Sequence, residues 1–110
     1  MTQHEERPLV TDVAALLQDQ GSATYREVLR VPSLSLGLFA APDEHDDTQQ
    51  PHRQDEVYVV VEGSAVLDVD GERTAVAAGS VAYVPAGVPH RFVDVRGDLR
   101  VLVVFAPPEE

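Results

Sequence analysis

Residues 50–63 read QPHRQDEVYVVVEG, and this stretch decides how the rest of the chain is interpreted. It holds a run that is apolar on both faces, preceded by an imidazole and a carboxylate four positions apart, His52 and Glu56. Side chains two and four positions apart share one face of a strand, so Gln50, His52 and Glu56 can point the same way as Tyr58. A carboxylate that faces a core needs a partner, because an unpaired buried charge is strongly destabilising. The stretch therefore predicts either a solvated strand entrance or a shared ligand site.

Length, charge and composition bound the possible functions. A chain of 110 residues is expected to form one domain, and its net charge of −11 argues against non-specific binding to nucleic acid. The absence of cysteine excludes disulfides, thiolate metal sites and cysteine nucleophiles. The first ten residues are polar, without the apolar core of a signal peptide, and no apolar run is long enough to cross a bilayer. We therefore expect a cytoplasmic protein that binds neither nucleic acid nor membrane.

One helix and many short strands are predicted. Residues 11–20 are typical of a short helix with Thr11 as N-cap, Asp12 in the first turn and Gly21 after its end. The dipeptide Asp70-Gly71 is the strongest hairpin signal in the chain. The runs between Gly, Pro and Asp residues predict an all-β double sheet or closed antiparallel barrel; they cover 23–31, 33–40, 56–63, 65–71, 73–79, 80–87, 90–95 and 99–106. The long polar connection 41–52 leads directly into His52. Loops of this length in a compact domain are either mobile or functional, and the position of His52 favours a functional one.

A second histidine lies in the stretch GSVAYVPAGVPHRFVD, residues 79–94. Gly79, Pro85, Gly87 and Pro89 restrict the backbone before it and deliver His90 to the start of a strand in a set position. Two histidines and one glutamate brought together by a barrel match the facial arrangement that leaves open positions on a divalent transition metal. We therefore expect His52, Glu56 and His90 to converge, whereas His4 and His45 have no supporting context.

These two stretches resemble the motifs of small single-domain cupins, and the resemblance covers residues 34–105. The first cupin motif ends in His, three or four residues, Glu, six residues, Gly; His52, Glu56 and Gly63 match it. The second motif is matched by four residues at the family's spacing: Gly79, Pro85, Gly87 and His90. Two positions depart from the family: Gln50 stands where the first motif has another histidine, and Asp94 stands where the second often has Asn. We expect the Asp94 change to affect packing and not the metal.

The resemblance implies a double-stranded β-helix, or jelly-roll barrel, over residues 31–110, preceded by a helix and lead strand in residues 1–30. It implies a divalent metal (Fe, Mn, Ni or Zn) held by His52, Glu56, His90 and an amide oxygen of Gln50 or Gln49. The implied function is metal-dependent chemistry on a small molecule, of oxygenase, isomerase or lyase type, in which Glu56 and Tyr58 are the candidate catalytic residues. The alternative is a non-catalytic barrel that binds or senses a small ligand.

A dimer is also expected from the pattern of the strands. Val57, Val59 and Val61 make the face opposite Glu56 apolar, and the run 99–106 is likewise apolar on both faces. A strand with water on one side should alternate between apolar and polar residues. Such strands need a second cover, either the N-terminal segment or another subunit, and we expect a homodimer through this face.

Overall fold

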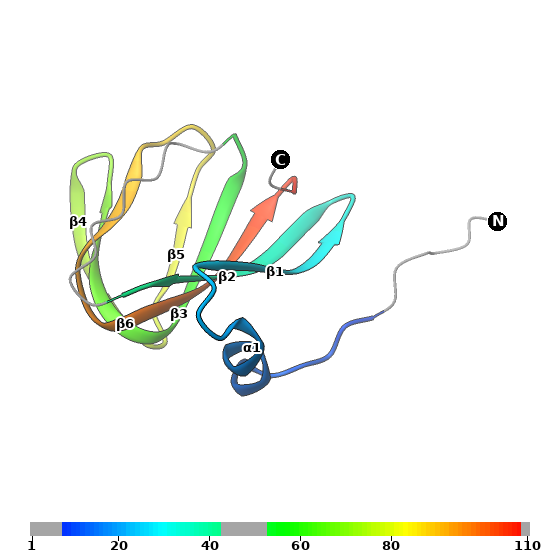
Figure 1. The fold of residues 1–110 in the computed structure, drawn as a ribbon. Coiled ribbons are helices and arrows are strands. Elements are labelled where there is room, and N and C mark those ends of the chain that lie inside the picture. Colours follow the sequence, from blue (N-terminus) through cyan, green and yellow to red (C-terminus); the bar gives the residue numbers. More distant parts are fainter. Residues whose placement is uncertain (1–7, 43–52, 109–110) are drawn as a thin grey trace.

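A computed structural model describes residues 8–42 and 53–108, and nearly all of the regular structure is β (Figure 1). Every pair of neighbouring strands is antiparallel, as the sequence predicts. Within the described ranges no helix has the length and apolarity needed to cross a membrane. The elements in chain order are α1 (Val13–Gln20), β1 (Tyr25–Val31), β2 (Leu34–Ala41), β3 (Asp55–Val69), β4 (Glu72–Ala77), β5 (Val81–Val84) and β6 (His90–Ala106).

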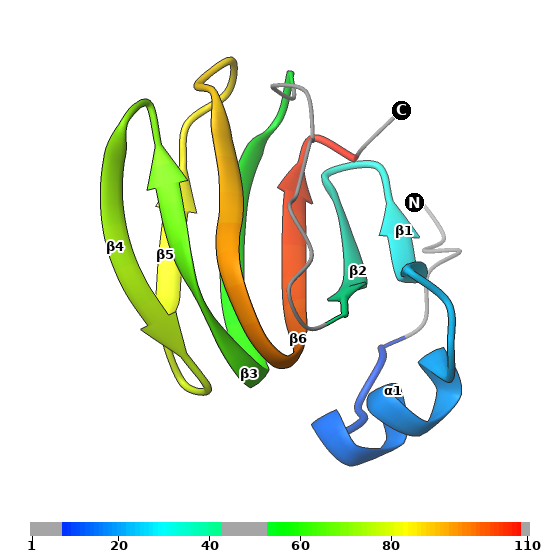
Figure 2. The ribbon, with the colours of Figure 1, turned by 60° about the vertical axis from the view of Figure 1, so that its left-hand side comes forward.

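Two long strands, β3 and β6, organise the sheet. The strand order is β1-β2-β6-β3-β4, and β5 also pairs with β3. The first half of β3 pairs with β5 and with the second half of β6, whereas its second half pairs with β4 and with the first half of β6. The sheet therefore curls over on itself, so that β4 and β5 stand near each other at one side of the molecule (Figure 2).

The sequence prediction divided each of these long strands in two, and that was wrong. The runs 56–63 and 65–71 belong largely to β3, and the runs 90–95 and 99–106 both belong to β6. Register shifts between Val60 and Val66 carry the pairing through the bend. At Gly63, with φ of 79°, a Cβ would lie 2.9 Å from the Cα of Leu99, so the two strands approach more closely there than a side chain allows.

The predicted helix is present, but its N-cap was misassigned. Asp12, not Thr11, is the N-cap: its backbone is extended and its Oδ1 accepts a hydrogen bond from the backbone N–H of Ala15 at 2.9 Å. Gly21 follows the last turn with φ of 54°, as predicted. The helix packs on β1 and β2, where Gln20 donates from Nε2 to the carbonyl of Leu38.

The core lies between the two halves of the curled sheet. The largest fully buried apolar side chains are Tyr58, Phe92, Leu38 and Leu99. Asp70 and Gly71 form the predicted two-residue hairpin between β3 and β4, both with positive φ, which is the conformation of a type I′ turn. The inward face of β3 enters this core as Tyr58 and Val60, and Glu56 continues the same row toward the end of the strand.

Candidate metal centre

Glu56 belongs to the inward row of β3 and is buried. Along this strand Glu56, Tyr58 and Val60 alternate with more exposed residues, and their exposed fractions are 1%, 1% and 2%. The carboxylate is therefore held on the buried face, which is the second of the two alternatives that the sequence left open. A group in this position has to be neutralised by a proton, a cation or hydrogen-bond donors.

His90 is positioned by the turn between β5 and β6. The backbone N–H of Val88 donates to the carbonyl of Pro85 at 3.3 Å, and Gly87, at the third position of the turn, has φ of 79°. These features define a type II turn, which requires glycine or asparagine at that position. The run of Pro and Gly in the sequence therefore fixes the point at which β6 begins with His90.

The His90 ring is anchored on its Nδ1 side. Nδ1 lies 2.8 Å from the carbonyl oxygen of Val88. A carbonyl only accepts hydrogen bonds, so Nδ1 carries a proton and Nε2 is the nitrogen available to a ligand. Hydrogen bonding of one ring nitrogen to a backbone carbonyl is the usual way in which a metal-binding histidine is oriented.

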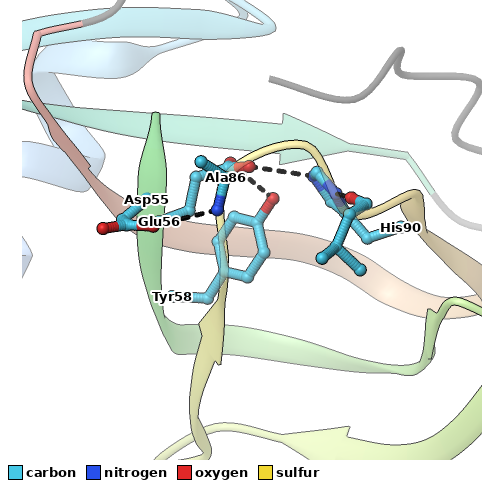
Figure 3. A network of polar contacts seen from close by, with 6 residues as sticks. Asp55, Glu56, Tyr58, Ala86 and His90 are labelled. Carbon is cyan, nitrogen blue, oxygen red and sulfur yellow. Dashed lines mark hydrogen bonds and ion pairs between the residues drawn. The ribbon is translucent and has the colours of Figure 1, made fainter. Parts of the chain in front are cut away.

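Two side chains meet at the Glu56 carboxylate (Figure 3). Tyr58 donates from its hydroxyl to Oε1 at 2.8 Å, and Nε2 of His90 lies 3.1 Å from Oε2. The His90 and Glu56 side chains are 0% and 1% exposed, so bulk water does not screen this contact. Glu56, Tyr58 and His90 therefore lie together on the inward face.

The contact between His90 and Glu56 has three chemically consistent states. With a second proton on the ring, it is an imidazolium–carboxylate ion pair. With a neutral ring and a proton on Oε2, the carboxyl group donates a hydrogen bond to Nε2. With a neutral ring and an ionised carboxylate, Nε2 and Oε2 both present lone pairs and a cation must stand near both. Metal–ligand bonds of about 2.0–2.2 Å that meet at a right angle place two donors about 3 Å apart. The observed 3.1 Å fits two neighbouring ligands of one metal ion.

The other predicted ligands, Gln50 with its alternative Gln49, and His52, lie outside the described residues. In residues 8–42 and 53–108, no group of three His, Cys, Asp or Glu side chains is placed to hold a metal ion. The structure therefore supplies two neighbouring donors, and the sequence supplies the candidates for the others.

Asp55 supports the site, and the sequence analysis missed it. Its Oδ1 accepts a hydrogen bond from the backbone N–H of Ala86 at 2.9 Å, which ties the start of β3 to the turn before His90 (Figure 3). Asp55 immediately precedes Glu56, so the two carboxylates point to opposite faces of the strand. An adjacent pair of acidic residues at a strand start is the signal that could have suggested these two roles.

An aromatic wall borders the site. The Tyr58 ring meets Phe92 edge-on with 5.2 Å between centroids, and Phe92 stacks with Phe39 at 6.2 Å. Tyr58, which the sequence places on the face of Glu56, and Phe92, two residues after His90 on β6, are both buried. The predicted packing role of Asp94 is wrong: its side chain is exposed, and its φ of 52° is a left-handed backbone conformation that Asp and Asn tolerate better than most residues.

The curled antiparallel sheet, with an acid and an imidazole meeting on its inner face, defines a small jelly-roll protein. Residues 39–105 match the family model described as "Cupin domain", and the chain belongs to this family. The expected jelly-roll architecture is confirmed by the solved structures that it resembles.

Three similar proteins illustrate the match. An uncharacterized protein of Streptomyces coelicolor is 55% identical over 85 residues, which cover 77% of this chain and 81% of that protein. The crystal structure of BH2720 from Bacillus halodurans is similar with a TM-score of 0.84 and 20% identity, over 100% of this chain and 89% of that one. The crystal structure of TT1209 from Thermus thermophilus has a TM-score of 0.74 and 25% identity, over 90% and 97% of the two chains.

Proposed function

We propose that this cupin binds one divalent transition metal inside its barrel and acts there on a small molecule. The ligands are Glu56 and His90, together with His52 and the amide oxygen of Gln50 or Gln49. The observation that carries the proposal is the 3.1 Å separation of Nε2 and Oε2 between two fully buried side chains. Fe, Mn, Ni and Zn all suit a set of imidazole, carboxylate and amide donors.

The orientation of the two donors suits a shared metal ion. Nδ1 of His90 is committed to the Val88 carbonyl, and Oε1 of Glu56 is committed to the Tyr58 hydroxyl. Each residue therefore turns its remaining donor atom toward the same point. This is the pattern of metal ligands that are held by outer partners before the ion arrives.

When bound, the metal supplies an open coordination position that can polarise a substrate oxygen. The protein contributes position and a dry environment. Tyr58 holds one carboxylate oxygen, so that Glu56 offers Oε2, and the rings of Phe92 and Phe39 exclude water from the neighbouring volume. Glu56 and the Tyr58 hydroxyl are the groups available to accept or donate a proton beside a bound substrate.

A second function is favoured by the same contact. An imidazolium–carboxylate pair between His90 and Glu56 is complete without a metal, and it would rigidify a barrel that only binds or senses a small ligand. The two functions differ in metal content, so measurement of metal separates them.

The test is the metal content of the purified protein and its affinity for added metal. Protein stripped with EDTA is titrated calorimetrically with Zn²⁺, Mn²⁺ and Ni²⁺, and anaerobically with Fe²⁺. We expect one equivalent per chain, lost in His90→Ala and weakened at least tenfold in Glu56→Gln. Glu62→Gln is the matched control, because Glu62 lies on the same strand but is exposed. His45→Ala is the control for an imidazole outside the proposed ligand set.

The outcomes separate the two functions. Equal metal affinity in the wild type and His90→Ala would overturn the metal site. A folded protein that takes up no metal, and that loses no stability in His52→Ala, would leave the non-catalytic barrel. If metal binds, oxygen consumption with catechol, flavonol and diketone substrates tests oxygenase chemistry.

A further inference from the structure

The inner face of the barrel continues onto the edge strand β1. On β2, Ser35 is 0% exposed and lies opposite Phe105, and Phe105 in turn lies opposite Glu56 on β3. Residues directly opposite each other in antiparallel strands point to the same face, so Ser35 belongs to the inward row of Glu56. Arg30 on β1 lies opposite Ser35. The row that contains the candidate metal ligand therefore ends in an arginine.

A β-bulge turns Arg30 toward this face. The pairing of β1 with β2 shifts register between Glu27 and Leu29, where β1 holds one extra residue. In an unbroken strand Arg30 would share the face of Arg26, because residues four positions apart point the same way. The extra residue reverses the alternation, so Arg30 points inward and Arg26 outward. Bulges are over-represented next to active sites, where they change the direction of a side chain.

The contacts of β1 agree with this assignment. Nε of Arg30 donates to Oε1 of Glu27 at 3.0 Å, and Nη2 lies 2.7 Å from the same oxygen. Residues three positions apart in a regular strand point to opposite faces, so this contact depends on the bulge. The ring of Tyr25 lies over Gly37 on the same face, where a Cβ on Gly37 would be 2.7 Å from Cε1 of the ring. Tyr25, Glu27 and Arg30 therefore stand on the interior side of β1.

Arg30 is at the same end of the barrel as the candidate metal centre. The turn between β1 and β2, the turn between β5 and β6 and the start of β3 all lie at this end (Figure 2). Neighbouring strands are about 4.8 Å apart, so three strand spacings place the Cα atoms of Arg30 and Glu56 about 14 Å apart along the sheet. Both side chains point to the same face. A small molecule can therefore contact the guanidinium at one end and an ion held by Glu56 at the other.

We propose that Arg30 determines substrate specificity by binding a carboxylate of the small molecule whose other end reaches the metal. The substrate class is thus a small organic acid, and this inference rests on the proposed function for the position of the reacting end. Glu27 holds one edge of the guanidinium through a single oxygen and so sets its direction. The other edge of an arginine carries N–H groups in a fixed fork that matches a carboxylate.

Charge favours the same assignment. The chain has a net charge of −11, so its surface as a whole repels anions. A substrate carboxylate therefore needs a local cation, and the Arg30 side chain is 49% exposed, which leaves it accessible from solvent. Exposed ion pairs contribute little to stability, so the fold should tolerate the loss of the pair between Arg30 and Glu27. Variants at Arg30 are therefore suitable for a binding test.

The test compares dicarboxylic acids with their monoamides on the Zn²⁺-loaded protein at pH 7, by titration of amide chemical shifts. The probes are malonate, succinate, glutarate and adipate, because their increasing length measures the span between the metal and Arg30. We expect the wild type to bind the best-fitting diacid about tenfold more tightly than its monoamide, since the bond to Arg30 is charge-assisted only with the acid. Arg30→Gln should lose this preference and keep its affinity for the monoamide.

Two further variants separate recognition from general charge. Arg26→Gln removes the same charge from the same strand but on the outer face, and it should keep the preference for the diacid. Arg30→Lys keeps the charge but not the planar fork, and it should keep only part of the preference. A merely structural role of Arg30 would change the affinities for acid and amide alike.

The outcomes separate this proposal from the proposed function. Metal uptake reports on the proposed function, whereas the ratio of acid to amide affinity reports on Arg30. The Arg30 proposal is overturned if no diacid is preferred over its monoamide, if the preference survives in Arg30→Gln, or if Arg26→Gln removes it equally. If the protein takes up no metal, succinate is compared with its neutral diamide on the metal-free protein, and equal binding in the wild type and Arg30→Gln overturns the proposal there as well.

Discussion

Removal of one oxygen atom from Tyr58 tests whether the Glu56 carboxylate is a charged, buried acceptor. The Tyr58 hydroxyl donates to Oε1 at 2.8 Å, and both residues are 1% exposed. In Tyr58→Phe no water replaces the lost donor without opening the core. A hydrogen bond to a charged group contributes about 1.5–3 kcal/mol, so we expect the free energy of unfolding to fall by about 2 kcal/mol.

The assay is thermal and urea unfolding of the metal-free protein in EDTA at pH 7. For a chain of 110 residues, about 2 kcal/mol corresponds to a decrease of about 9 °C in Tm. Tyr83→Phe is the matched control, because it removes the same atom from a tyrosine that is 61% exposed, and its effect should stay within about 0.5 kcal/mol. A loss below about 0.5 kcal/mol in Tyr58→Phe would refute the reasoning, since the carboxylate would then not depend on this donor.

Three further predictions concern metal binding, a surface tyrosine and the bend of the sheet. Protons compete with metal ions for imidazole nitrogens, so metal affinity should fall as the pH drops below about 6; calorimetry that finds stoichiometric binding at pH 4.5 would contradict this. Partial burial, followed by the charge and hydrogen bond of Asp55, raises the pKa of Tyr83 above 10.0, so its contribution to stability is present below pH 10 and is lost as the pH rises further. Asp55→Asn should lower the pKa of Tyr83, measured by titration of the tyrosine absorbance in the ultraviolet, and Tyr83→Phe identifies which absorbance change belongs to Tyr83. An unchanged titration midpoint in Asp55→Asn would show that Asp55 does not raise this pKa. Gly63→Ala should lower the free energy of unfolding in urea by about 1–3 kcal/mol more than Gly71→Ala does. Both glycines have positive φ, but only at Gly63 would the added Cβ lie within 3 Å of backbone atoms. Equal losses in the two variants would argue against a close approach of the strands at Gly63.

The candidate site was predictable where its signals are local. Alternation along β3 placed Glu56 and Tyr58 on one face, and the spacing of Pro85 and Gly87 predicted a turn that delivers His90. Both signals depend on a few neighbouring residues, whose backbone conformations are restricted by their own side chains. The partners of each donor were not predictable in this way, because the Val88 carbonyl is a backbone group that every residue has, and the Asp55 contact joins positions 31 residues apart.

The sequence by itself determined the all-β class, the single helix, the hairpin at Asp70-Gly71 and the shared face of Glu56 and Tyr58. Only the tertiary structure decided that four of the predicted strands merge into two long ones, β3 and β6. The register shifts and the close backbone contact at Gly63, which let each strand continue through the bend, depend on which strands pair. It also decided which outer face the helix covers and which it leaves exposed. The alternation of apolar and polar residues along a strand indicates that one of its faces is apolar, but only the packing of segments distant in the sequence determines what lies against that face.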